Sequence, residues 1–598
     1  MNTRKTCDET AQERVLILDG AMGTMIQGLD LAEADFRGGR FASHTKSLWG
    51  CNDALCLTNP DVIESVHRSY LEAGADIIET CSFNATAVSL AEYGLEAWAY
   101  EISAAAARIA RNAADAFSTP DAPRFVAGSM GPTAKSAGIA PDMYDLSKRS
   151  VTFDELAAAY YDNARGLLDG GADLLLIETV FDIINAKAAV FAVNRLKEER
   201  RCHIPLMISA TIANDAGHIL SGQSLAAFCA AVCHGNPWAL GLNCSFGAAA
   251  LEPHVRELAG LAPCLVIAYP NAGLPNRQGA YDETPQTMAA HLERYLRQGL
   301  VNILGGCCGS TPAHIAAVAE LARGFPPRKL PGRAPAALGN FRTDRRPPES
   351  VILIGDRTNG AKNQEFARLI AGEDYDEGVS IAQDMLESGA GGITVCMDGV
   401  LPDASRAITR FLNLGLCYPL FARALIIIES SDWDTVEAGL KCLPGKGLAR
   451  SLSLNEGAGE FLRKARQARR YGAAVAAALD DEQGAPAGYQ GQIARAERAY
   501  ALLTGGGIPP EAIVFDCAAL PKPGLGRESY DGGFHHDRDD FARFRERIGK
   551  TCPLAAVLAN VSDFLPESPA GSGVTLAIVN PAAAVWPRKG VSPPPPTH

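Results

Sequence analysis

The chain has 598 residues, 47% hydrophobic and 21% charged, with a formal net charge of −13, a globular composition that excludes a fibrous or disordered chain. The acidic balance disfavours a nucleic-acid partner, which selects a basic surface. The sequence has neither an apolar run long enough for a membrane span nor the apolar core of a signal peptide at its charged N-terminus, so we expect a cytoplasmic protein without a membrane partner.

Short apolar runs alternate with longer amphipathic stretches over the first 310 residues, a pattern typical of βα units around a parallel sheet. Eight runs without a glycine-rich phosphate motif after the first favour a TIM-type (β/α)8 barrel over a doubly wound open sheet, which is the alternative. Polar residues or glycine follow each run, and these positions lie at the mouth of a barrel, where active sites are built. The predicted strands are 15–18, 75–79, 124–128, 173–177, 205–210, 239–242, 264–269 and 301–304.

A second series of runs follows a Pro- and Arg-rich segment, residues 326–350, which we interpret as a linker. The predicted strands are 351–355, 392–397, 424–429, 449–454, 473–479, 512–516, 553–559 and 574–579.

The last connection of this series, residues 560–573, contains two prolines and no helical pattern, although a crossover between parallel strands normally includes a helix. We therefore expect an α/β protein with two TIM-type barrels in tandem, the second incomplete or degenerate at its C-terminal closure. The predicted domains are 1–325 and 351–585, followed by a Pro-rich tail at 586–598.

Three cysteines follow predicted strands of the first barrel, Cys244 after the sixth and the adjacent Cys307 and Cys308 after the eighth. Three thiolates suit zinc, which prefers sulfur and in catalytic sites keeps a fourth position open. Glycines at 305, 306 and 309 would let both adjacent sulfurs face one ion. The alternatives are inert cysteines and a strained vicinal disulfide. Another pair, Cys229 and Cys233, lies one helical turn apart in an apolar stretch and is interpreted as core.

Several motifs of the first domain, in order, resemble the homocysteine-binding domain of cobalamin-dependent methionine synthase. They are ILDGAMGTMIQ (17–27), GADIIETCSFNAT (74–86), GSMGPT (128–133), LIETVFDIINAKAA (176–189), SGQS (221–224), GLNCSFGA (241–248), YPNAGLPN (269–276) and GGCCGSTPAHI (305–315).

The resemblance implies that Cys244, Cys307 and Cys308 hold zinc and bind the homocysteine sulfur. It also implies that Asp19 and Glu178 help to hold the amino acid. Backbone amides at Met22 and Gly23 would meet its carboxylate, and Asn271 would be a fourth zinc ligand when substrate is absent. Without the resemblance, Asp19 and Glu178 would be interpreted as turn or capping residues.

The second domain is similar to the pterin-binding, methyltetrahydrofolate-dependent barrel of the same enzymes in ILIGDRTNGAK (352–362), IAQDMLESGAGGITVCMDG (381–399) and residues 434–475. The similarity weakens where a pterin would bind, because Thr394, Cys396 and Gly399 replace polar residues of the family motif. Lost hydrogen-bond partners leave ligand groups unpaired, so the pattern favours a scaffold or docking surface over bound 5-methyltetrahydrofolate. The residues that could still form a pterin site are Asp356, Arg357, Asn359, Asp398, Asp516 and Asn560.

The sequence therefore predicts a zinc-dependent homocysteine S-methyltransferase that makes methionine. No cobalamin-binding motif follows the second barrel, so methylcobalamin is expected on a separate corrinoid protein. The alternatives are a complete methionine synthase core that also uses 5-methyltetrahydrofolate, an enzyme that takes its methyl group from betaine or S-methylmethionine, and a binding or assembly protein for a corrinoid carrier.

Overall fold

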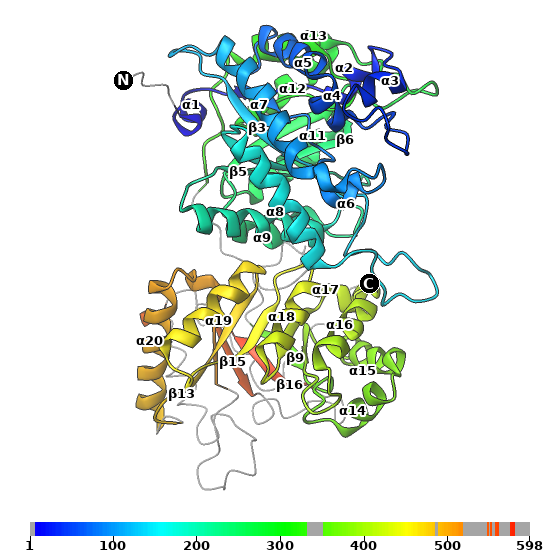
Figure 1. Ribbon diagram of the computed structural model, residues 1–598. Coiled ribbons are helices and arrows are strands. Elements are labelled where there is room, and N and C mark those ends of the chain that lie inside the picture. Colours follow the sequence, from blue (N-terminus) through cyan, green and yellow to red (C-terminus); the bar gives the residue numbers. More distant parts are fainter. Residues whose placement is uncertain are drawn as a thin grey trace. The chain divides into compact units, whose positions relative to one another are not determined.

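A computed structural model describes residues 6–331, 351–484, 488–517, 547–548, 550–552, 556–560 and 574–579. The chain divides into two compact units, Met1–Ile139 with Ser150–Ala334, and Ala140–Arg149 with Pro335–His598. In each unit, helices surround a central set of strands (Figure 1). The tandem barrels predicted from the sequence are confirmed. Most of the predicted linker and the Pro-rich tail lie outside the described residues.

The first unit contains an eight-stranded parallel sheet in the order β1-β8-β7-β6-β5-β4-β3-β2. Alternate residues of these strands, such as Leu174 and Leu176, face the interior and form a buried apolar core. The strands are β1 (Leu16–Ile17), β2 (Ile77–Glu79), β3 (Phe125–Met130), β4 (Leu174–Val180), β5 (Leu206–Ala210), β6 (Ala239–Gly247), β7 (Leu265–Asn271) and β8 (Ile303–Leu304).

The helices of this unit pack outside the sheet, and consecutive long helices such as α7, α8 and α9 are neighbours. They are α1 (Cys7–Glu13), α2 (Met22–Gln27), α3 (Glu33–Arg37), α4 (Leu55–Thr58), α5 (Pro60–Glu72), α6 (Ala87–Leu90), α7 (Ala99–Phe117), α8 (Phe153–Asp169), α9 (Ile183–Arg200), α10 (Leu225–Val232), α11 (Ala248–Leu261), α12 (Pro285–Arg297) and α13 (Pro312–Ala322). Short 3-10 helices are Asn52–Ala54, Glu96–Trp98 and Cys233–Gly235.

A buried carboxylate joins β1 to β2, the two strands at the edges of the first sheet. Asp76 accepts a hydrogen bond from the Ile17 backbone at 3.0 Å and ion pairs with Arg14 and Arg124 at 2.6 and 2.7 Å. One parallel bridge, between Leu18 and Ile77, continues the contact. Backbone hydrogen bonds from the Asp76 amide to the Ile17 carbonyl at 2.7 Å and from the Asp19 amide to the Ile77 carbonyl at 3.0 Å complete the closure between β1 and β2.

The second unit is a closed barrel in the order β10-β11-β12-β13-β14-β15-β16-β9. Its strands are β9 (Val351–Gly355), β10 (Gly392–Val395), β11 (Leu425–Glu429), β12 (Leu448–Leu454), β13 (Ala474–Asp481), β14 (Ile513–Asp516), β15 (Ala556–Asn560) and β16 (Val574–Val579). Its helices are α14 (Gln364–Ala371), α15 (Tyr375–Glu387), α16 (Ala404–Gly415), α17 (Pro419–Arg423), α18 (Trp433–Cys442), α19 (Ala458–Arg470), α20 (Gly488–Gly505) and a 3-10 turn at Pro510–Ala512.

The second barrel was expected to be incomplete or degenerate at its C-terminal closure, and its last strand, β16, runs in the reverse direction. β16 pairs antiparallel with both β15 and β9, whereas the other strand pairs of this barrel are parallel. A parallel eighth strand would need a crossover, but an antiparallel neighbour can follow a direct connection, so the missing helical pattern in 560–573 has a physical reason. The barrel is therefore degenerate in topology while its ring of strands is complete. None of the described helices is long and apolar enough to cross a membrane.

We predict that Asp76→Ala lowers the free energy of unfolding by about 3 kcal/mol, because it leaves buried donors of Ile17 and Arg124 without their acceptor. Equilibrium urea unfolding measures the change. The matched control is Asp115→Ala, since Asp115 is 58% exposed in its ion pair with Arg111, and a surface pair contributes about 0–1 kcal/mol. Equal effects of the two substitutions would contradict the role given to Asp76.

Candidate active site

The three predicted metal-ligating cysteines meet at the mouth of the first barrel. Their sulfur atoms all lie within 4.8 Å of one another, and the Cys244 and Cys308 sulfurs are 3.4 Å apart. Within the described part of the chain, this is the one group of three such side chains placed to hold a metal ion. The structure thus brings together residues that are 63 positions apart in the sequence.

An irregularity in β6 directs Cys244 toward the other two thiols. The pairing of β6 with β7 shifts register between Asn243 and Gly247, and Cys244 has a φ of +54°, which is uncommon for a residue with a side chain. A local bulge of this kind re-aims a side chain at a barrel rim. The neighbouring Asn243 is fully buried, and its amide nitrogen lies 3.9 Å from the Cys307 sulfur.

The glycines around the cysteine pair are needed mainly because neighbouring side chains pack against their backbone, and less because the backbone adopts unusual angles. A Cβ atom on Gly305 would lie 2.7 Å from Leu18 Cβ, and one on Gly309 would lie 2.2 Å from the Tyr281 ring. Gly309 has a φ of +80°, whereas Gly305 and Gly306 do not require a positive φ. The expectation of unusual backbone angles therefore holds for one of the three glycines.

The thiols are electrostatically unequal. Hydrogen bonds from the Cys244 and Cys307 thiols, joined by one from the Tyr281 hydroxyl, lower the pKa of Cys308 to about 3. The same contacts with Cys244 and Cys308 raise the pKa of Cys307 well above its usual range. These contacts make Cys308 the thiol of the three that loses its proton most readily.

Three acidic residues lie at the same mouth, and the two that are buried, Asp19 and Glu178, were predicted as substrate-binding residues. Asp19 and Glu178 are 2% and 5% exposed, and Glu79 belongs to the same electrostatic group. Burial raises the pKa of Asp19 and of Glu79 well above the usual range, and repulsion from Glu178 adds to both shifts. Burial raises the pKa of Glu178 to about 7, against the hydrogen bond that it accepts from Ser129.

These carboxyl groups have unused hydrogen-bonding capacity. Asp19 Oδ2 accepts from the Glu79 backbone amide at 3.0 Å, but Asp19 Oδ1 and Glu79 Oε1 are buried without a hydrogen-bond partner among the described residues. No ion pair of these carboxylates with a Lys or Arg is present in the described ranges. Buried polar atoms normally have partners, so this cluster fits a ligand that brings a positive charge.

The other predicted substrate-binding residues border the same mouth. Met22 and Gly23 form the first turn of α2, and a Cβ atom on Gly23 would make an ordinary contact, 3.8 Å from the Asn52 side chain. Asn271 ends β7 and is 5% exposed, with its Oδ1 atom unpartnered within the described residues. Their assignment to substrate remains a prediction.

The second cysteine pair lies away from this cluster. Cys229 is buried in α10, and Cys233 begins the short 3-10 helix that follows it. Burial raises the pKa of the Cys229 thiol well above its usual range, as in an inert core residue. The pair does not form a three-residue metal group among the described residues.

Comparison with known proteins supports a methyltransferase. A family model described as homocysteine S-methyltransferase matches residues 16–322, which is half of the chain. The chain belongs to the homocysteine S-methyltransferase family. A model described as pterin binding enzyme matches residues 355–532. The two matches confirm the predicted resemblance to a homocysteine-binding domain followed by a pterin-binding domain.

Solved structures similar to this member of the family include the homocysteine methyltransferase MmuM from Escherichia coli. Its metallated form is 28% identical, with a TM-score of 0.41, and the match covers 52% of this chain and 98% of that chain. Its oxidized form is also 28% identical, with a TM-score of 0.40, covering 51% and 95%. A B12-independent methionine synthase from Shewanella sp. W3-18-1 in complex with selenomethionine is 13% identical, with a TM-score of 0.29, covering 45% and 89%.

In the pterin-binding-like barrel, two predicted site residues lie in one polar cluster around Arg450, at the mouth. Asp516 contacts the arginine directly, and Asn359 contacts Glu429, which also pairs with the arginine. Arg450 of β12 contacts Asp516 of β14 and Glu429 of β11, at 2.5 and 2.8 Å. Asn359 donates to the same Glu429 oxygen at 3.4 Å. Burial alone would lower the pKa of Arg450, but the two carboxylates raise it on balance.

Two of the remaining predicted pterin residues, Asp398 and Arg357, have contacts with other residues. Asp398 accepts from the Ser430 hydroxyl and the Ser431 amide at 2.5 and 2.7 Å, so it orders the loop after β11. Arg357 ion pairs with Glu365 at 3.6 Å. Asp356 directly follows β9. Asn560 ends β15, but its side chain lies outside the described residues.

Sequence reasoning missed Glu79 and Arg450. Glu79 had a visible signal, because the tetrapeptides IIET at 77–80 and LIET at 176–179 place Glu79 and Glu178 alike, at the ends of two strands. Arg450 is the one charged residue in its predicted strand, ARSLSL at 449–454, and a charged residue inside a barrel strand indicates a buried partner.

We predict that the stability of the metal-free protein falls as the pH rises from about 4.5 to about 7, because folded Glu178 keeps its proton while unfolded glutamate, with a pKa of about 4.3, loses it. The unfolded state then binds fewer protons, so the free energy of unfolding decreases with pH, by about 1.4 kcal/mol per unit for one group.

Glu178→Gln should make the slope of the unfolding free energy with pH less steep, by the amount expected for one proton. Urea unfolding at a series of pH values measures this slope. The control Glu293→Gln changes a partly exposed residue that pairs with Arg297 on α12 and should keep the slope. A Glu178→Gln profile identical to that of the unchanged protein would refute the protonation assigned to Glu178.

Proposed function

We propose that the chain is a zinc-dependent homocysteine S-methyltransferase that makes methionine, and that its methyl group comes from methylcobalamin carried by a separate corrinoid protein. The observation that carries this proposal is the cluster of three cysteine sulfurs within 4.8 Å of one another. The cluster lies in the domain that matches the homocysteine S-methyltransferase family.

The donor set fits zinc. Three sulfur atoms are soft ligands, and three protein ligands with a fourth position left for substrate are the pattern of catalytic zinc. Cys244, Cys307 and Cys308 would hold the ion. Bound zinc would supply a centre at which the substrate thiol loses its proton at neutral pH. Asn243 and Tyr281 would orient the cysteine ligands, since contacts of this kind fix ligand geometry at metal sites.

The carboxyl cluster would hold the amino acid. A homocysteine ammonium group has three donors, and Asp19 and Glu79 each offer a buried oxygen without a partner among the described residues. A cation there would also lower the mutual repulsion of Asp19, Glu79 and Glu178. The substrate carboxylate would meet the backbone amides at the first turn of α2, where Gly23 has no neighbour closer than ordinary contact distance.

Methylcobalamin is favoured as donor because the second barrel offers little for a folate. Its Asp516 is engaged by Arg450, and Asp398 is engaged by Ser430 and Ser431. The alternatives are a core that also uses 5-methyltetrahydrofolate, direct use of betaine or S-methylmethionine, and a binding or assembly protein for a corrinoid carrier. The cysteine cluster favours an enzyme over the last of these.

The decisive assay mixes the purified, zinc-loaded chain with homocysteine and, in separate reactions, each donor. We expect methionine with free methylcobalamin and none with 5-methyltetrahydrofolate plus cobalamin, betaine or S-methylmethionine, as measured by mass spectrometry. Turnover with 5-methyltetrahydrofolate would establish the complete core. Turnover with a small donor alone would replace the corrinoid proposal.

Replacing one ligand tests the metal. We expect Cys308→Ala to lose zinc after dialysis and to reduce methionine formation by at least a hundredfold, because two thiolates bind zinc less tightly and leave its coordination incomplete. Metal content is measured by atomic absorption alongside activity. Cys229→Ala, a change of a buried thiol in α10, is the control and should keep both. Full activity in Cys308→Ala would refute the assignment.

A further inference from the structure

An arginine side chain crosses the mouth of the second barrel. Arg450 is on β12, while Asp516 is on β14, and β13 lies between these two strands. The Arg450 Nε and Nη2 atoms face the Asp516 Oδ2 and Oδ1 atoms at 2.5 and 3.4 Å. Its Nη1 atom reaches Glu429 of β11 at 2.8 Å. The guanidinium therefore links carboxylates from both sides of its own strand.

Two local features direct Arg450 across the mouth. The pairing of β12 with β13 shifts register between Ala449 and Leu452, and Ser451 has a φ of +98°, a strained value for serine. A bulge here turns the side chain away from its regular direction. On β13, the residue paired with Asp516 is Ala478, which is too small to separate the arginine from the aspartate.

The arginine and one of its two carboxylates are buried. The Arg450 and Asp516 side chains are 7% and 3% exposed, whereas Glu429 is 25% exposed. Two carboxylates buried without a cation would repel each other and lose hydration. The arginine thus supplies the positive charge that this mouth needs, and a ligand would have to displace it.

A guanidinium and the edge of a pterin ring present the same pattern to a carboxylate. Each carries two N–H groups side by side on a planar C–N frame, and a carboxylate accepts such a pair through both oxygens. The paired Nε and Nη2 contacts with Asp516 use this pattern within the chain itself. The barrel that carries it matches the pterin binding enzyme model.

We propose that Arg450 is an internal occupant of the second barrel's ligand site: its guanidinium takes the place of the 2-aminopyrimidine edge of a pterin and excludes such ligands from the mouth. Arg450 is thereby the residue that determines which ligands this barrel accepts. This inference concerns the second barrel alone, so its test uses binding and not methyl transfer.

The test compares the full chain with Arg450→Ala and uses two probes. The first probe is 6-methylpterin, titrated by its fluorescence. The second is guanidinium chloride at low millimolar concentration, far below denaturing levels, with urea as the uncharged control, followed by thermal unfolding. The substitution opens a space that a guanidine-shaped group can fill beside Asp516.

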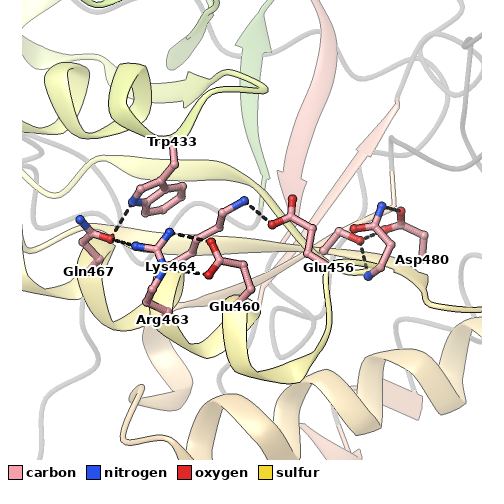
Figure 2. A network of polar contacts seen from close by, with 9 residues as sticks. Trp433, Glu456, Glu460, Arg463, Lys464, Gln467 and Asp480 are labelled. Atoms are coloured by element: carbon pink, nitrogen blue, oxygen red, sulfur yellow. Dashed lines mark hydrogen bonds and ion pairs between the residues drawn. The ribbon is translucent and has the colours of Figure 1, made fainter.

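The matched control is Arg463→Ala in the same barrel. Figure 2 shows Arg463 on α19 contacting Glu460 and Gln467, apart from the Lys464–Glu456 pair and the contacts of Asp480. Arg463 is 51% exposed and Glu460 is 36% exposed, so this arginine also pairs with a carboxylate but at the surface. Its removal should create no site for either probe.

We expect Arg450→Ala to bind 6-methylpterin at least about tenfold more tightly than the unchanged protein. Guanidinium should raise the unfolding temperature of this variant. It should not raise the unfolding temperature of the unchanged protein or of Arg463→Ala. The double variant Arg450→Ala with Asp516→Ala should lose both responses. Equal pterin binding with and without Arg450, or no response of the variant to either probe, overturns the proposal.

Removal of the arginine could prevent folding, because two carboxylates then lack their cation. In that case Arg450→Gln, which keeps a polar side chain, is tested together with Glu429→Gln, which removes one of the two negative charges. The same tenfold gain in 6-methylpterin binding supports the proposal, and unchanged binding overturns it.

Discussion

A negative charge in a barrel mouth that excludes water must be neutralised or matched by a cation, and both halves of this protein are arranged around that requirement. The first mouth contains Asp19, Glu79 and Glu178, with raised pKa values and no arginine or lysine paired to them in the described ranges. The second contains Glu429 and Asp516, joined by Arg450. One mouth is prepared for a ligand that brings positive charge, and the other already contains its own.

Breaks in strand regularity place the chemically important side chains in both mouths. Cys244, Thr179 beside Glu178, and Ser451 beside Arg450 all have positive φ, and each lies at a register shift between neighbouring strands. Regular parallel strands would alternate side chains strictly between the barrel interior and the helices. At each of these strained residues the strict alternation is interrupted, so that a side chain can turn into the mouth where a regular strand would direct it elsewhere.

Much of the fold could be predicted from sequence, because each strand is a short apolar run and the helices between them are amphipathic. The meeting of Cys244 with Cys307 and Cys308 could also be predicted, since all three follow strands whose ends share one rim. The direction of β16 could not, because an apolar run looks the same whether it pairs parallel or antiparallel. The partnership of Arg450 with Asp516 depends on a bulge and on a small residue in the strand between them, and neither changes the periodicity of the sequence.

The reversed β16 also determines where its end lies. Val574 pairs with Gly355 at the mouth end of β9, and Val579 pairs with Val351 at the opposite end. β16 therefore finishes at the end of the barrel opposite its mouth. A peptide tag inserted directly after Val579 would begin on the far side from the second barrel's mouth, where it would least obstruct ligand access.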